Sequence, residues 1–233
     1  MIVAIHQPNY APWLGYFHKL ARSDHFVFLD DAQYSKNSYI NRVQIDGGGS
    51  LRWLSIPVSF SFGDSIAQVR FAEPGWRGAH LDTLKHYYGS APAFRAAWPR
   101  LAAIYDMLPL DNLAAANMAL VRSIAKELGI ETALHLSSEF DCGELRADER
   151  LARIVRALAP GGTYLSGSGG ANYQSEATFA IAGLRLTYAE FRHPTYPQGR
   201  EAFLAGLSIL DAVFQLGWEK TAALVAVPRH RAA

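Results

Sequence analysis

The spacing of apolar positions at the start of the chain changes from strand-like to helical and back again. Residues 1–6 are β-branched and apolar enough for a buried strand, and Pro8 and Pro12 prevent a helix from following directly. Apolar side chains at helical spacing predict a helix over residues 13–22, and residues 26–29 are typical of a second buried strand. A strand, a helix and a strand within about thirty residues predict a parallel pair joined by a right-handed crossover.

The middle of the chain breaks this alternation. Residues 39–45 and 51–58 flank the glycine-rich turn 46–50, which predicts a β-hairpin inserted into the sheet, and residues 66–71 predict a further strand. Between Gly75 and Gly129 the apolar positions have a helical period, so we expect three helices there.

The final third returns to alternating strands and helices. Strands are expected at 133–136, 163–165 and 184–191, and helices around 151–158, from near Tyr173, and over 203–225 with an interruption at Gly217. The chain is therefore predicted to be α/β, with a mainly parallel Rossmann-like sheet flanked by helices, an inserted β-hairpin and a helical subdomain. We expect one domain over residues 1–233, with a helical lobe at about 75–130.

Composition narrows the function classes. Lys and Arg number 22 against 21 Asp and Glu, for a formal charge of +1, so the chain lacks the basic field that binds along a nucleic acid tract. It has one cysteine, no basic leader and no apolar run of the ~18 residues that span a membrane, which predicts a cytoplasmic protein without a membrane span. No Cys/His cluster has the spacing of a structural zinc site, and the sequence implies no particular cofactor.

Ligands of parallel sheets bind at the carboxyl ends of the strands. Four predicted strands are followed by polar residues, which we expect to converge on one rim and to bind a small molecule. These residues are His6, Gln7, Asn9 and Tyr10 after the first strand, Asp30, Asp31 and Gln33 after the second, Ser166, Gly167 and Ser168 after a later one, and His193 and Tyr196 after the last.

Several of these positions have both a chemical and a structural interpretation. His6 is a candidate general base or electrostatic contact, or else makes a strand-end hydrogen bond. Asp30 and Asp31 suit a divalent cation that bridges a diphosphate, or else they cap a turn. The glycine-serine loop from Ser166 offers backbone N–H groups to an anion, or is a flexible turn between strand and helix.

Basic and amide side chains lie beside this rim. Lys19 is a compact charge that would neutralise a phosphate or carboxylate, or else a solvated surface residue. Asn37, Asn41 and Arg42 lead into the hairpin, where Arg42 would grip a carboxylate or phosphate with two parallel hydrogen bonds, or else brace the loop.

Three runs near the start of the chain, His6 to Lys19, Phe28 to Tyr34 and Asn41-Arg42, together resemble the WbqC-like protein family. Later segments agree in order: Trp53 to Val58, Tyr164 to Gly167, His193-x-x-Tyr196-x-Gln198, and Ser208 to Asp211. The resemblance thus covers nearly the whole chain. Members occur in gene clusters for O-antigen and related surface polysaccharides, and the activity suggested for them is glycine transfer onto a sugar.

The resemblance implies a transferase whose partner is a small molecule: an amino sugar, a nucleotide sugar or an activated amino acid. Such a transfer needs a base, for which we choose His6, and donors for the oxyanion, for which Asn9, Asn37 and the N–H groups near Gly167 are candidates. The catalytic candidates are His6, Asp30, Asp31 and His193. The substrate-binding candidates are Gln7, Asn9, Tyr10, Lys19, Gln33, Asn37, Asn41, Arg42, Ser166, Gly167, Ser168, Tyr173, Tyr196 and Gln198.

Two alternatives remain open. The histidine after the first strand and the late glycine-serine loop loosely resemble the HIGH-type nucleotide-binding superfamily, which implies nucleotidyl or adenylyl transfer, and an acidic pair holding a metal would suit a glycosyltransferase that uses a nucleotide sugar. The other is a non-catalytic sugar-binding protein of a polysaccharide assembly complex, which would keep aromatic side chains but need no titrating base.

Overall fold

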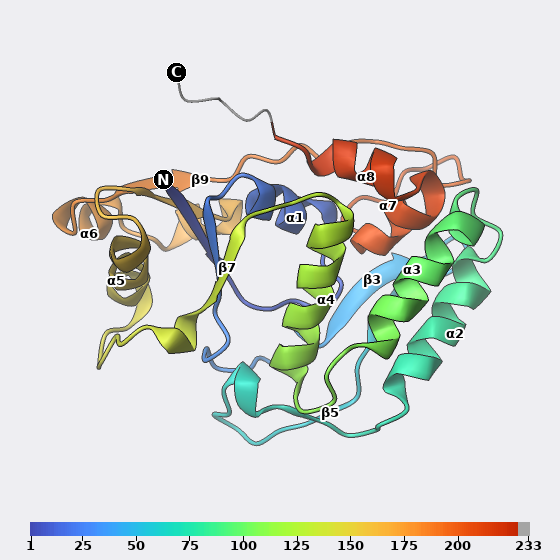
Figure 1. The fold of residues 1–233 in the computed structure, drawn as a ribbon, viewed down its shortest axis with the longest axis horizontal. Coiled ribbons are helices and arrows are strands. Elements are labelled where there is room, and N and C mark those ends of the chain that lie inside the picture. The colour runs from blue at the N-terminus through green and yellow to red at the C-terminus, as the bar shows by residue number, and fades with distance from the viewer. Residues whose placement is uncertain (228–233) are drawn as a thin grey trace.

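Within residues 1–227, which the computed structural model describes, five strands form one parallel sheet (Figure 1). In spatial order these strands are β7 (Ala133–Leu136), β2 (His25–Phe28), β1 (Ile2–His6), β8 (Thr163–Ser166) and β9 (Arg185–Tyr188). Ala4 in the central strand lies opposite Phe26 on one side and Leu165 on the other. The predicted α/β fold with a parallel sheet is confirmed.

The order of the strands reverses beside β1. The chain builds outward from β1 through β2 to β7, then returns across the sheet to β8 and builds outward again to β9. The two chain directions therefore separate between β1 and β8. In doubly wound sheets a crevice opens at this switch point, at the carboxyl ends of the strands, and ligands bind there.

Helices cover both faces of the sheet. Val3, Ile5 and Val27 point to one face, where they pack against α5 (Ala147–Leu158) and α6 (Glu176–Ile181). Ala4 and Phe26 point to the other face, which α1 (Leu14–Ala21) covers together with α4 (Leu113–Glu127) (Figure 1). This alternation follows directly from the two-residue period of a strand.

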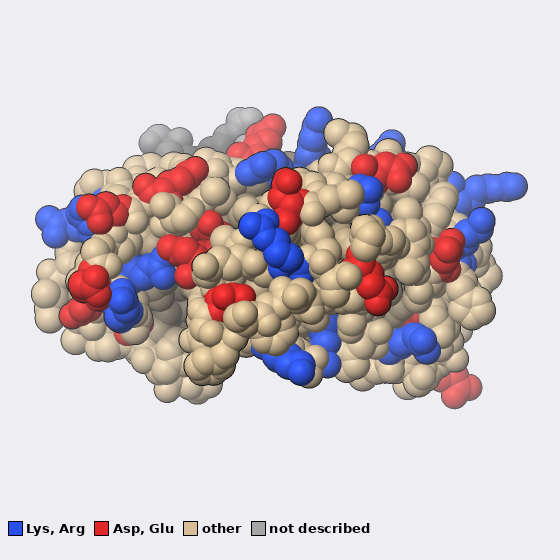
Figure 2. Space-filling view, turned by 90° about the horizontal axis from the view of Figure 1, so that it is seen from below, with Lys and Arg blue, Asp and Glu red and all other residues tan. Residues whose placement is uncertain are grey.

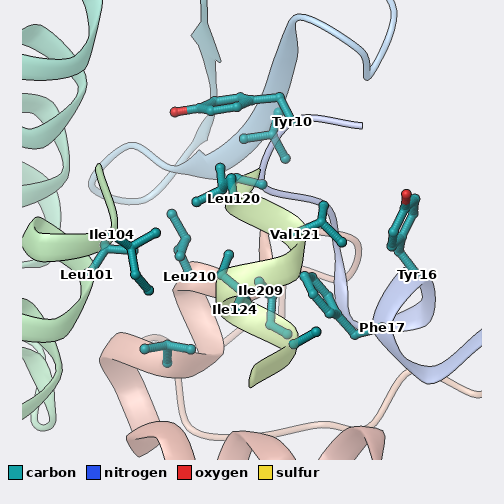
Figure 3. Close-up of a cluster of buried hydrophobic side chains, with 14 of the residues drawn as sticks. Tyr10, Tyr16, Phe17, Leu101, Ile104, Leu120, Val121, Ile124, Ile209 and Leu210 are labelled. Atoms are coloured by element: carbon teal, nitrogen blue, oxygen red, sulfur yellow. The ribbon is translucent and has the colours of Figure 1, made fainter. Parts of the chain in front are cut away.

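The larger apolar core lies on the α1 side. Phe17, Val121, Ile124 and Ile209 meet there, from helices α1, α4 and α7 (Ile209–Leu216) (Figure 3). α2 (Trp76–Tyr88) and α3 (Phe94–Asp106) extend this core away from the sheet, and α8 (Trp218–Val225) packs on α7 and α1. The three helices predicted between residues 75 and 129 are confirmed, whereas the one-domain organisation stays a prediction.

The predicted hairpin is present, but it is not inserted into the main sheet. β3 (Arg42–Asp46) and β4 (Leu51–Ser55) form a separate antiparallel pair, and the backbone N–H of Ser208 donates to the carbonyl of Gln44 at 2.8 Å. A second small pair joins β5 (Val58–Ser59) to β6 (Arg70–Phe71). The strand expected over 66–71 is therefore mostly wrong, because Ile66–Gln68 form a 3-10 turn.

Other element boundaries also differ from the prediction. The last helical region begins at Ile209 rather than 203, because the Ser208 hydroxyl caps it: Oγ accepts from Leu210 N at 3.3 Å and donates to the Ala11 carbonyl at 2.7 Å. β9 ends at Tyr188 rather than 191. Along residues 1–227, no helix is both long enough and apolar enough to cross a membrane.

Candidate functional site

The switch point between β1 and β8 is occupied by polar side chains. His6 is the last residue of β1, and Ser166 is the last residue of β8. Lys19 comes from α1, whose apolar residues Leu14, Phe17 and Leu20 hold the helix against the sheet. The Lys19 stem follows the same surface, with Nζ 5.9 Å from the centre of the Phe26 ring.

The hydrogen bond of His6 fixes its tautomer. Nδ1 lies 3.1 Å from the carbonyl oxygen of Gln7, and because a carbonyl only accepts, Nδ1 carries the proton and Nε2 keeps its lone pair. The Tyr16 ring packs edge-on at 4.8 Å, and its hydroxyl donates to the same carbonyl at 3.1 Å. Burial and the nearby Lys19 ammonium lower the pKa of His6 to about 3. The ring is therefore neutral at neutral pH.

Lys19 is a buried amine with little to hold its charge. The side chain is 3% exposed, and Nζ donates to the carbonyl of Ile5 at 2.9 Å. None of the ion pairs between residues 1 and 227 includes it, and burial lowers its pKa to about 7. The sequence predicts that Lys19 contacts the substrate, but its amine is buried against the carbonyl of Ile5, the residue before His6. Its lowered pKa means that the proton exchanges near neutral pH.

The loop after β8 folds back over Ser166. A Cβ at Gly170 would lie 2.3 Å from the Ser166 Oγ, so the close approach requires glycine. The loop forms a 3-10 turn over Ser168–Asn172, and the first N–H groups of such a turn, those of Ser168 and Gly169, have no acceptor inside it. Tyr173 follows and is largely exposed. This loop presents free donors beside the end of β1.

The two aspartates after β2 bind to residues that follow β7. Asp30 is buried and accepts from Ser138 N at 3.1 Å, Ser138 Oγ at 2.8 Å and Ser137 Oγ at 3.1 Å. Asp31 accepts from Ser137 Oγ and pairs with Arg150 of α5. Burial raises the pKa of Asp31, but the hydrogen bonds from Arg150 and Ser137 outweigh it and lower this pKa overall. The pair ties two strand ends together.

Ser137, Ser138 and Arg150 were not among the predicted site residues. The two serines directly follow the predicted strand 133–136, so the rule that selected the other strand ends would have found them. Arg150 lies on a helix and gave no such signal. Among residues 1–227, no cluster of three His, Cys, Asp or Glu side chains is arranged to hold a metal ion.

The segment from Gln33 to Arg42 crosses the loop that leaves β1. The backbone N–H of Tyr10 donates to the carbonyl of Tyr39 at 3.0 Å. Asn117 of α4 is fully buried, and its Nδ2 donates to the carbonyls of Pro8 at 2.8 Å and Ile40 at 2.7 Å. Two chain segments from different parts of the sequence are thereby fixed together beside the site.

The predicted binding residues of this segment have different surroundings. Gln33 forms a β-bridge to Ser65 and is exposed, and Asn37 is an exposed residue in the left-handed region, with φ of 58°. Asn41 Nδ2 donates to the carbonyl of Ile56 at 3.3 Å. Arg42 stacks on Trp53, with Cζ 4.1 Å from the ring centre. Only Arg42 offers a charge.

Tyr10 does not reach the rim, contrary to expectation. Its ring is buried and points into the helices α2 and α3 (Figure 3). The hydroxyl is 2.6 Å from both His80 Nδ1 and the Tyr105 hydroxyl. Gln7 and Asn9, its neighbours in the same loop, are half-buried and buried respectively.

His193, Tyr196 and Gln198 contact helices α1 and α7 and do not directly follow a strand. The His193 ring stacks on Trp13 with centroids 6.1 Å apart. Tyr196 Oη and Gln198 Nε2 donate to Asp211 Oδ2 at 2.6 and 3.0 Å. The reason is that β9 ends early, so these residues follow a long loop that packs along α1 and α7 rather than a strand end. Asp211, which the site prediction omitted, is the acceptor that fixes this loop.

The larger cavities lie elsewhere. One of about 710 Å³ opens at the amino ends of the strands and is lined by Ile2, Asp24, Thr132 and Val225 among others. Since parallel sheets bind ligands at their carboxyl ends, we assign the chemistry to the His6 end despite this volume. Figure 2 views the molecule from the side toward which β1 runs in Figure 1, and acidic and basic side chains alternate over that face. It offers local contacts rather than a field of one sign.

These features define an α/β protein with a doubly wound parallel sheet and a polar candidate site where the strand order reverses. Comparison with known proteins then gives the particular family. The chain belongs to the WbqC-like protein family, whose model matches residues 7–223, so the resemblance seen in the sequence is confirmed. It is 33% identical over 220 residues to the uncharacterized protein Rv1507c of Mycobacterium tuberculosis (strain ATCC 25618 / H37Rv), a match that covers 93% of this chain and 94% of that protein. No solved structure matches it significantly.

Proposed function

We propose that this protein is a cytoplasmic transferase of O-antigen or surface-polysaccharide biosynthesis, which moves a glycyl or other aminoacyl group onto an amino sugar. The family and its suggested activity support the reaction class. The observation that carries the proposal is His6: a neutral imidazole whose Nε2 lone pair is free, at the switch point of the sheet.

The reaction would use this lone pair directly. The sugar amine attacks the acyl carbon, a C–N bond forms, and the bond from that carbon to the leaving group breaks. His6 Nε2 takes the proton that the amine loses and passes it to the leaving group. An anionic substrate beside the ring would raise the pKa of His6 from about 3 toward the working range.

The groups around His6 would stabilise the oxyanion and hold the site residues in position. The free N–H groups of Ser168 and Gly169, together with the Asn9 amide, are proposed as donors to the tetrahedral oxyanion. Asp30 and Asp31 are proposed to hold the carboxyl ends of β2 and β7 together through their hydrogen bonds with Ser137 and Ser138. Lys19 is proposed as a positioning residue, whose nearby positive charge lowers the pKa of His6 and so favours its neutral form.

The test is a transfer assay with the full chain. The protein is incubated with nucleotide-linked amino sugars and activated glycine, and mass spectrometry follows the gain of one glycyl residue. Replacing His6 by Ala or by Gln is expected to lower turnover at least about a hundredfold. His86→Gln, an exposed histidine of α2, is the matched control. Wild-type turnover in both His6 variants would exclude His6 as the base.

The strand order also favours a second candidate function. The first three strands build outward in one direction and the last two in the other, as in doubly wound nucleotide-binding sheets, and a histidine ends the first strand. Nucleotidyl or adenylyl transfer, or glycosyl transfer from a nucleotide sugar, would use the same end of the sheet. A rise in melting temperature with ATP but not with amino sugars would favour it, because a ligand of the native state stabilises that state. Binding of amino sugars without turnover would instead favour a non-catalytic sugar-binding protein.

A further inference from the structure

Arg42 and Trp53 of the β3–β4 hairpin form an aromatic and cationic cluster with Tyr39, which precedes the hairpin. The Arg42 guanidinium carbon lies 4.1 Å from the centre of the Trp53 ring, and the Tyr39 ring lies 5.7 Å from the same ring. Trp53 is 39% exposed and Tyr39 is 49% exposed. Large aromatic side chains gathered on an open face bind flat apolar surfaces.

Arg42 has no acidic partner. None of the ion pairs within residues 1–227 involves it, and its Nε is buried without a hydrogen-bond partner. Stacking on Trp53 orients the guanidinium. Because no carboxylate pairs with it, its terminal nitrogens are available for a planar, bidentate contact with an anion.

Two neighbouring polar atoms are also unpartnered. The Tyr34 hydroxyl and the Asn41 Oδ1 are buried without hydrogen bonds. Tyr34 lies near Arg42: burial raises the pKa of Tyr34, and the charge of Arg42 opposes that rise. Buried polar atoms without partners cost stability, and an unpartnered hydroxyl near an unpaired cation, as at Tyr34, indicates a place prepared for a ligand.

This cluster is fixed to the loop that leaves the His6 strand. Tyr10 N donates to the Tyr39 carbonyl at 3.0 Å, and Asn117 joins the carbonyls of Pro8 and Ile40. A molecule held on the hairpin face would thus be held by the same loop system that positions His6.

We propose that Trp53, Tyr39 and Arg42 form a subsite for a sugar phosphate. The apolar face of the pyranose ring packs on Trp53 and Tyr39, and the phosphate takes the terminal nitrogens of Arg42. The identity of the sugar as an amino sugar rests on the proposed function; the ring-and-phosphate chemistry rests on the hairpin alone.

The experiment is calorimetric titration of the full chain with glucosamine 1-phosphate, without any acyl donor. Glucosamine and inorganic phosphate are titrated separately, so that ring and anion contributions are distinguished. Trp53→Ala and Arg42→Gln are each expected to weaken binding of glucosamine 1-phosphate by about tenfold or more. Arg42→Lys keeps the charge without the planar fork and should restore only part of the affinity.

The opposite face of the same hairpin supplies matched controls. Arg52 lies over the Tyr87 ring at 5.4 Å, so Arg52→Gln removes an equivalent arginine-aromatic contact and should leave binding unchanged. Tyr39→Ala alters an exposed ring and keeps the test informative if Trp53→Ala fails to fold. Thermal unfolding of every variant checks the fold.

The outcomes separate this subsite from the transferase activity. Absence of binding by the wild type, equal weakening by Arg52→Gln, or inorganic phosphate binding as tightly as the sugar phosphate would each overturn the subsite. Binding that depends on Trp53 and Arg42, in a protein that shows no glycyl transfer, would leave the subsite standing and contradict the proposed reaction.

Discussion

Asp211 and Lys19 are both buried ionisable residues, yet their surroundings differ. Asp211 is fully buried and accepts hydrogen bonds from Tyr196 and Gln198, which come from the loop between β9 and α7. Lys19 has a single backbone carbonyl as acceptor. Burial raises the pKa of Asp211 and lowers that of Lys19, and in both cases this disfavours the charged form.

This difference separates polar groups that hold the fold together from polar groups that can take part in a reaction. Where side chains from other elements gather on a buried group, as on Asp211, the group holds the fold together. Where an ionisable group at the carboxyl end of a strand hydrogen-bonds to a backbone carbonyl rather than to side chains, as Lys19 and His6 do, it is suited to exchange protons with a ligand. The predictions below test this distinction, from the largest expected effect to the smallest.

Asp211→Ala is expected to destabilise the fold by about 3 kcal/mol, because the Tyr196 hydroxyl and the Gln198 amide lose their buried acceptor. Chemical denaturation measures the free energy of unfolding. Asp82→Ala, on the exposed face of α2, is the control and should change it by less than about 0.5 kcal/mol. A small effect at Asp211 would mean that these bonds do not hold the loop.

Asp211 also predicts a pH dependence. Its pKa is raised in the folded state by burial, so its contribution to stability is fully present below the unfolded value of 3.8 and is lost as pH rises through the folded value. Asp211→Asn keeps the shape and one acceptor oxygen but cannot ionise. The variant should therefore lack this part of the pH dependence when unfolding is measured across acidic pH.

Lys19→Met is expected to stabilise the protein by about 2 kcal/mol at neutral pH, since it removes a poorly paired buried amine. The folded pKa of about 7 lies below the ordinary lysine pKa of 10.5, so the unfolded chain binds more protons between these values and wild-type stability rises over that pH range. The variant should lose this rise. Lys85→Met, on an exposed position of α2, is the control. A less stable variant with the wild-type pH dependence would contradict our account of Lys19.

Arg150→Gln is expected to have the smallest effect, about 0.5 kcal/mol, because the pair with Asp31 is partly solvated, with side chains 20% and 35% exposed. The overall lowering of the Asp31 pKa gives stability that is present above the unfolded value and is lost as pH falls through the folded one. The variant should show less of this acid loss. Arg146→Gln, which removes an exposed pair with Glu144, should leave it unchanged.

The strands and most helices could be predicted from the sequence because each has a local pattern of apolar residues: the continuous apolar run in β1 and the helical spacing in α1 are both visible within a few residues. The carboxyl-end rule likewise found His6, Asp30 and Ser166. The separate hairpin could not be foreseen, because a partner far along the chain, Ser208, pairs with β3.

Side-chain direction was the harder part of the site. Tyr10 follows the first strand closely, but Ala11 has a φ of 39° and the hydroxyl bonds to His80 and Tyr105, which lie in distant helices. From the sequence, Lys19 is typical of a surface position on a helix. Its burial follows from packing against β1, where Nζ donates to the Ile5 carbonyl. Such contacts are tertiary, and the local pattern does not contain them.

The most direct test of the central claim, that Lys19 is a buried amine near His6 whose proton exchanges near neutral pH, is an NMR titration of the lysine side chains. The chain has five lysines, and Lys19→Met assigns the signal of interest. We predict that Lys19 titrates near pH 7 and that its signal shifts when a nucleotide-linked amino sugar is added. A Lys19 signal that titrates at its ordinary value of 10.5 and does not respond to the sugar would contradict the account.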